Sequence, residues 1–154
     1  MWTIEPETSS IWREIAELHV FFVDWFTGAC ADDDAIFDAR FTSRFDANAL
    51  YVMPGGDVHA FASFAAKFQA AHGSNPNFGI HIRSVRSRAL GEEQVLALYE
   101  ELQRGAKASE HAENARLTTA VFRQDATMPN GLKWLHLHET WLPEDARAAA
   151  DFAW

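Results

Sequence analysis

The chain has 154 residues, a length typical of one domain that buries a hydrophobic core without disulfides or structural metals. Apolar residues make up 48% and charged residues 23%, which is usual for a globular protein and excludes disordered, collagen-like and mucin-like chains. The net charge is −9, whereas binding to nucleic acid or anionic lipid depends on a basic surface. We therefore expect neither nucleic acid nor a membrane as a partner.

The N-terminal residues and the cysteine content favour a cytoplasmic location. Residues 1–10 lack the basic and then apolar pattern of a secretion signal. The longest strongly apolar run, residues 20–23, ends at Asp24 and is too short to span a bilayer. A single cysteine, Cys30, cannot form an internal disulfide, which fits a reducing compartment.

A long amphipathic helix is expected near the N-terminus. Hydroxyl side chains at residues 8–10 can cap its start, and Gly28 can end it. Its apolar side chains recur at helical spacing and cover nearly half of the circumference, which is too wide for one neighbour. This face consists of Ile11, Trp12, Ile15, Leu18, His19, Phe22, Val23, Trp25 and Phe26. We expect this helix to lie in the concavity of a bent sheet.

The rest of the chain predicts two more helices followed by a sheet. Residues 32–41 have the pattern of a second helix, residues 49–53 of a short strand, and residues 57–73 of a third helix. A short helix is expected within residues 143–154. Four long strands joined by turns are expected at residues 78–89, 94–104, 115–123 and 132–142. Helices followed by an antiparallel meander indicate an α+β fold with a curved, cone-like sheet whose mouth can hold a ligand.

This element order and two motifs resemble the nuclear transport factor two-like, or SnoaL-like, superfamily. Residues 51–56, Tyr-Val-Met-Pro-Gly-Gly, are similar to its short strand and Pro-Gly turn. Residues 131–140 resemble the Gly-Lys-Trp and His motif of the calcium/calmodulin-dependent kinase two association domain, and residues 116–118 resemble the preceding strand. The resemblance covers about residues 8–142. It implies one domain over residues 1–154, with a C-terminal tail at 143–154.

Three residues are candidates for acid–base catalysis. His19 lies on the apolar face of the first helix, where an imidazole can act as a general base. A core histidine held by one hydrogen bond is the alternative. Tyr99 and Glu101 share one strand face and Glu100 lies on the other, so one glutamate is expected to point inward, where burial raises its pKa. Cross-strand pairing with an arginine such as Arg116 is the alternative.

The walls of the expected pocket are assigned to Trp12, Phe22, Phe26, Arg116, His138 and Trp141. His136 and His138 are two residues apart on one strand, so we expect them on one face together with Trp134 and Thr140. Two histidines hold a metal only with a third ligand, and no motif supplies one. We expect neither a metal nor another cofactor, and keep His136 and His138 as the alternative metal ligands.

The leading hypothesis is a pocket protein that binds a small hydrophobic or carboxylated organic ligand, as a homodimer in the cytoplasm. Chemistry in such a pocket would be acid–base catalysis without a cofactor, of the isomerase, cyclase or hydrolase type. The alternative is a non-catalytic homo-oligomerisation or interaction domain similar to the kinase-association domain. The superfamily hosts both kinds of protein, so the sequence leaves open whether the chain is an enzyme.

Overall fold

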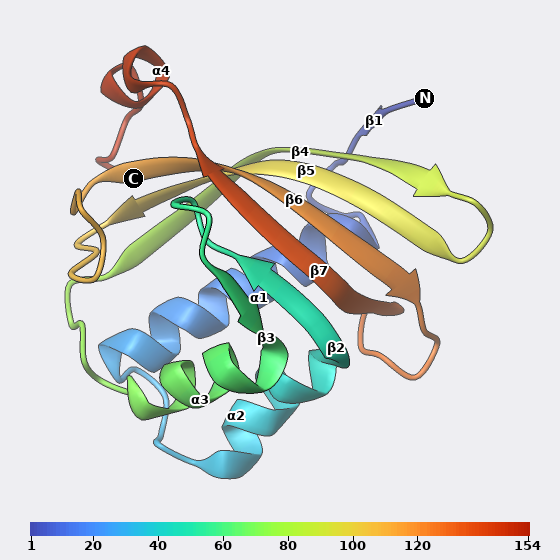
Figure 1. Cartoon of the computed structure of the whole chain (residues 1–154), viewed down its shortest axis with the longest axis horizontal. Helices are drawn as coiled ribbons and strands as arrows, with labels where there is room; N and C mark the ends of the chain where they lie inside the picture. The colour runs from blue at the N-terminus through green and yellow to red at the C-terminus, as the bar shows by residue number, and fades with distance from the viewer.

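The computed structural model describes residues 1–154, and its longest helix lies against the concave side of a curled sheet (Figure 1). Helix α1 (Ser10–Thr27) begins after Ser9, whose hydroxyl accepts a hydrogen bond from the backbone N–H of Trp12. It ends at Gly28, which has a φ of 78°, a left-handed conformation that glycine adopts readily. The predicted first helix and its place under the sheet are confirmed.

One seven-stranded sheet, curled but not closed, forms the other layer. Its strands follow the order β1-β4-β5-β6-β7-β2-β3. Neighbours from β4 to β7 pair antiparallel, as the meander prediction requires, whereas β2 pairs in parallel with β7. The strands are β1 (Thr3–Ile4), β2 (Phe45–Val52), β3 (Val58–Ala60), β4 (Gly79–Leu90), β5 (Gln94–Arg104), β6 (Asn114–Gln124) and β7 (Leu132–Trp141).

Of the remaining helices, α2 (Asp34–Arg40) and α3 (Phe61–Ala70) lie together beside α1, whereas α4 (Glu144–Ala148) follows β7 and lies apart from them (Figure 1). A 3-10 turn (Thr42–Arg44) follows α2. The third helix begins four residues later than predicted, because residues 58–60 extend as β3 and pair with β2. Residues 3–4 add a short edge strand that the sequence pattern did not indicate. No helix is both long and apolar enough to cross a bilayer.

A bulge in the last ladder reverses the faces of β7. The register shifts between Val121 and Phe122, so Phe122 pairs with Trp134 while Val121 pairs with His136. Trp134 is therefore buried on the inner face, whereas His138 is exposed on the outer face. This corrects the prediction that these residues share a face. It also turns Glu139, which is 4% exposed, toward the interior.

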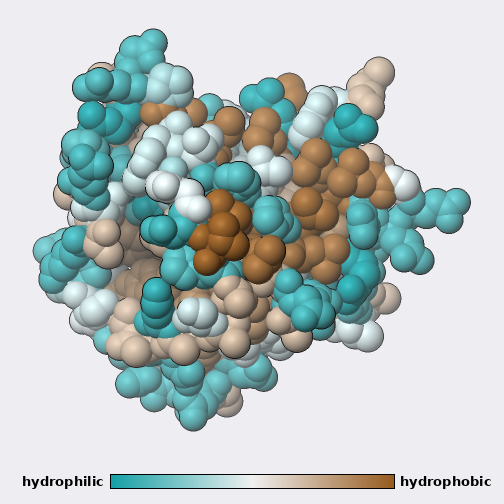
Figure 2. All heavy atoms as spheres, in the orientation of Figure 1, coloured by the Kyte–Doolittle hydropathy of each residue, from teal (hydrophilic) through white to brown (hydrophobic).

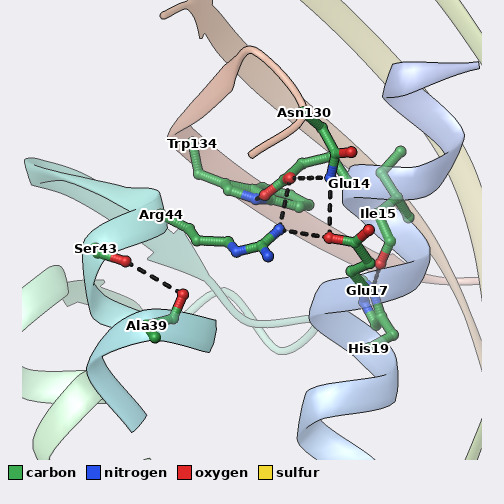
Figure 3. A network of polar contacts seen from close by, with 9 residues as sticks. All are labelled: Glu14, Ile15, Glu17, His19, Ala39, Ser43, Arg44, Asn130 and Trp134. Atoms are coloured by element: carbon green, nitrogen blue, oxygen red, sulfur yellow. Dashed lines mark hydrogen bonds and ion pairs between the residues drawn. The ribbon is translucent and has the colours of Figure 1, made fainter. Parts of the chain in front are cut away.

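Aromatic side chains fill most of the space between the helices and the sheet. Phe41 is fully buried, and its ring lies within 6.0 Å of those of Phe21 and Phe45. A polar network closes one end of this core, where Glu14 is also fully buried. Figure 3 shows Trp134 and Arg44 pointing toward Glu14, whose carboxylate accepts hydrogen bonds from them at 2.9 and 2.8 Å. Each oxygen of this buried carboxylate thus has a donor, as burial of charge requires.

Candidate functional site

A cavity of about 560 Å³ remains between α1, α3 and the inner face of the sheet. This volume lies within the usual range for small-molecule sites. Apolar side chains form 13 of the 24 lining residues, so most of the wall is suited to an apolar surface. The aromatic part of the wall consists of Phe22, Phe26, Phe45, Tyr51, Phe64, Phe68 and Phe78.

One part of the wall is polar and deeply buried; we call it the polar end. It consists of His19 from α1, Glu101 and Gln103 from β5, Arg116 from β6 and Glu139 from β7. None of these residues is more than 8% exposed. Strand alternation points residues 101 and 103 to the same face, and the β5–β6 register sets Glu101 opposite Arg116. The sheet therefore brings three of its strands to one polar cluster above α1.

His19 and Glu101 form a buried pair in which each ring nitrogen of His19 has its own partner. The Nδ1 atom of His19 lies 2.7 Å from the carbonyl oxygen of Ile15, and a carbonyl only accepts, so Nδ1 carries a hydrogen. The Nε2 atom lies 3.3 Å from a carboxylate oxygen of Glu101. Two unprotonated acceptors would repel at that distance, so a further proton lies between Nε2 and the carboxylate.

The interaction between the two residues raises the pKa of His19 and lowers that of Glu101, and both shifts favour an ion pair. Burial alone would lower the pKa of His19, but the charge and hydrogen bond of Glu101 outweigh burial and raise it. Burial would likewise raise the pKa of Glu101, but His19 and then Arg116 hold it well below its usual range. The favoured state at neutral pH is therefore an imidazolium beside a carboxylate.

Arg116 connects the rest of the polar end. Its guanidinium donates to Glu139 at 2.6 Å, to Gln103 at 3.1 Å and to Asn114 at 3.0 Å. Gln103 in turn donates to Glu101 at 2.6 Å. A continuous chain of hydrogen bonds thus runs from His19 to Glu139.

The two buried carboxylates differ in their proton affinity. Burial raises the pKa of Glu139, and the charge of Glu101 raises it further, while Arg116 and a hydrogen bond from Tyr51 oppose this. The pKa of Glu101 is lowered by its pairing with His19. Acid–base sites commonly contain two acids whose environments shift their pKa values in opposite directions in this way.

The structure brings together five of the residues named from the sequence. His19, Glu101, Phe22, Phe26 and Arg116 all line the cavity. The structural roles expected as alternatives are also present. His19 is hydrogen-bonded to a backbone carbonyl, and Glu101 lies opposite Arg116 on the neighbouring strand. Glu101 is thus the inward glutamate, whereas Glu100 pairs with Arg83 at 2.6 Å.

Four other named residues lie outside the cavity lining. Tyr99 is fully buried beneath it, with its ring centroid 5.5 Å from that of His19. Trp12 lies on the same face of α1 as His19 but nearly two turns earlier, beside the core and beyond the cavity. Trp141 lies at the end of β7, where its ring is 5.1 Å from the Arg116 guanidinium carbon. His138 is on the outer face because of the bulge in β7.

The sequence reasoning missed Gln103, Glu139 and Tyr51. Gln103 follows the alternation of β5 and was available from the pattern, whereas Glu139 depends on the bulge. No three His, Cys, Asp or Glu side chains lie together in a geometry that could hold a metal ion. The rings of His136 and His138 are 6.1 Å apart on the outer face.

Comparison with known proteins identifies the family. The model of the sucrose-6-phosphate phosphohydrolase C-terminal family matches residues 11–143. The chain belongs to this family. No curated protein matches the chain significantly.

Solved structures confirm the resemblance to the nuclear transport factor two-like superfamily. An NTF-2-like protein of unknown function from Pseudomonas aeruginosa is 28% identical, with a TM-score of 0.73, over 87% of this chain and 99% of that chain. An NTF2-like protein from Rhodospirillum rubrum is 15% identical, with a TM-score of 0.65, over 86% and 98% of the two chains. The calcium/calmodulin-dependent kinase hub of S. rosetta is 14% identical, with a TM-score of 0.61, over 84% and 95%. The last two matches show the shared fold alone.

Proposed function

We propose that the cavity binds a small organic molecule with an apolar body, and that a polar group of this molecule contacts the polar end. The observation that carries this proposal is the 560 Å³ space left between aromatic walls in a core that is otherwise filled with aromatic side chains. Close packing of protein interiors makes a space of this size unusual unless it has an occupant.

Proton transfer at the polar end is the chemistry that this geometry supports. His19 and Glu101 hold one proton between them, and Glu139, paired with Arg116, has a pKa raised by burial that favours its accepting a proton from a ligand. The Arg116 guanidinium lines the cavity and is only 8% exposed, which favours its stabilising negative charge on a ligand oxygen. We therefore propose acid–base chemistry of the isomerase, cyclase or hydrolase type, with His19 and Glu101 as catalytic residues. Tyr99 would hold the imidazole from below as a positioning residue.

The family to which the chain belongs takes its name from sucrose-6-phosphate phosphohydrolase, so a sugar phosphate is the alternative ligand class. A sugar phosphate carries a hydroxyl or phosphate group on most of its carbons and needs many polar partners, whereas 13 of the 24 residues of the cavity wall are apolar. Polar groups buried without partners cost free energy. The composition of the wall therefore favours an apolar ligand over a sugar phosphate.

Binding of the neutral fluorophore N-phenyl-1-naphthylamine tests the proposal. Ala71 caps the C-terminal end of α3 and lines the cavity, and Ala62 is exposed in the first turn of α3, so Ala71→Trp and Ala62→Trp are a matched pair. We expect Ala71→Trp to weaken binding at least about tenfold because the indole occupies the cavity, and Ala62→Trp to bind as the unmodified chain does. Sucrose 6-phosphate should not displace the probe. Equal binding by the two variants, or displacement by sucrose 6-phosphate, would contradict the proposal.

Self-association is the second candidate function, and it is supported by the outer face of the sheet. Apolar side chains from four adjacent strands gather there, and Figure 2 shows hydrophobic atoms over the middle of the sheet. They are Leu50, Val52, Leu96, Leu98, Leu117, Val121 and Leu135. A second copy of this chain would cover this face in a homodimer. The structural similarity to a kinase hub adds support.

A further inference from the structure

The charges that line the cavity are unevenly placed. Within the polar end, two acids face two bases: Glu101 lies beside His19 and Glu139 beside Arg116. With His19 protonated, these charges balance. The buried part of the cavity therefore favours an uncharged polar group, such as a carbonyl or hydroxyl, over a second full charge.

Two lysines at the mouth of the cavity have no acidic partner to balance their charge. Lys67 and Lys107 both line the cavity and are exposed, and neither forms an ion pair with a carboxylate. The ammonium of Lys107 lies 3.4 Å from the carbonyl oxygen of Ser74. Lys67, Ala71 and Ser74 line the cavity at helical spacing along α3 and the turn that follows it, so both lysines border the side of the cavity that this segment forms, which we call the lip. No acidic residue other than Glu101 and Glu139 lines the cavity.

We infer that the ligand is an amphipathic acid that binds in one orientation, with its acidic group at Lys67 and Lys107 and its uncharged polar group at the polar end. The aromatic wall between them holds the apolar body. This inference rests on the proposed function and adds the class and direction of the ligand. In a chain with a net charge of −9, two unpaired lysines at one lip also steer an anion toward the mouth.

A matched pair of probes tests the inference. The fluorophore 8-anilinonaphthalene-1-sulfonate has the ring system of N-phenyl-1-naphthylamine with an added sulfonate. The variant Lys67→Gln/Lys107→Gln removes two charges at the lip. Lys133→Gln/Arg88→Gln removes two charges from residues outside the lining and serves as the charge-matched control.

We expect the lip variant to bind the sulfonate probe about tenfold more weakly at low ionic strength, with the neutral probe almost unchanged. Added salt should narrow the difference, because both lysines are exposed. The control should bind both probes as the unmodified chain does. Equal weakening of both probes, no weakening of the sulfonate probe, or an equal effect in the control would overturn the inference and leave the proposed function standing. Failure of the unmodified chain to bind either probe would overturn both.

Discussion

The Nε2 atom of His19 lies 3.3 Å from a carboxylate oxygen of Glu101, and the side chain of each is only 4% exposed. The opposite ring nitrogen is held by the carbonyl oxygen of Ile15, so the imidazole cannot turn away from the carboxylate without losing a hydrogen bond. This pair joins α1 to the centre of the sheet and forms part of the cavity wall. It is therefore both a structural contact and the basis of the proposed chemistry.

The pair predicts a specific dependence of stability on pH. Because Glu101 raises the pKa of His19 above its ordinary value of 6.5, His19 contributes fully to stability below pH 6.5 and loses this contribution as pH rises through its raised pKa. Each unit of pKa shift corresponds to about 1.4 kcal/mol. In Glu101→Gln burial still lowers the pKa of His19, and only the weaker effects of the Ile15 carbonyl and Glu139 raise it, so the pKa should fall.

Titration of the histidine side chains by NMR, together with urea unfolding across the same pH range, measures this effect. His19→Gln identifies the His19 signal. A His19 midpoint below 6.5 in the unmodified chain, or a midpoint that Glu101→Gln leaves unchanged, would show that the pair does not share a proton as described.

The buried acid network of α1 predicts a large difference between two neighbouring glutamates. One carboxylate oxygen of Glu14 accepts from Trp134, and the other accepts from both Arg44 and Asn130. An amide nitrogen cannot accept, so Glu14→Gln should lower the free energy of unfolding by about 2–3 kcal/mol. Glu17 shares Arg44 and Asn130 but its side chain is 46% exposed, so Glu17→Gln should cost under about 1 kcal/mol. Urea unfolding of both variants compares them, and equal costs would argue against the network.

Two glycines with nearly the same φ test the close packing of the chain beside Ala106, which lines the cavity. Gly91 has a φ of 70° in an open turn, whereas a Cβ at Gly105, with a φ of 65°, would overlap the carbonyl oxygen of Asn77. Gly91→Ala should cost about 1 kcal/mol from the left-handed backbone alone. Gly105→Ala should cost about 3 kcal/mol or more, because the clash adds to that strain. The difference between the two unfolding free energies isolates the close approach, and a difference near zero would contradict it.

The proposed dimer predicts that charge on the outer face of the sheet abolishes self-association. Leu98 and Val121 lie on adjacent strands of that face. Leu98→Glu/Val121→Glu should convert a dimer to a monomer in size-exclusion chromatography with light scattering. Val20→Glu adds charge at a site on α1 that is 54% exposed and should leave the dimer intact. A monomeric unmodified chain would end this proposal.

Much of the fold followed from the sequence because it depends on local patterns. The wide apolar face of α1 predicted its place under the sheet, and strand alternation gave the shared face of Tyr99 and Glu101. The bulge before His136 could not be predicted, since it arises from pairing between strands and not from the residues of one strand. Because of that single register shift, Glu139 faces the cavity and His138, which was predicted there, does not. The cytoplasmic location stays a prediction.

The sequence also could not show which part of α1, along the helix axis, borders the cavity. A helical wheel gives the direction of each side chain but not its distance along the helix, so Trp12 and His19 were assigned to one pocket. In the structure only the C-terminal half of α1 borders the cavity, through His19, Phe22 and Phe26. Where a cavity begins depends on how far α3 and the sheet separate, and that is a property of tertiary packing.

The crystal structure of the complex with N-phenyl-1-naphthylamine tests the central claim most directly. The claim predicts density for the probe inside the cavity, with its rings against Phe22 and Phe68 and its amine directed toward the polar end. Density for the probe only on the outer face of the sheet, with the cavity closed by shifted side chains, would contradict the claim.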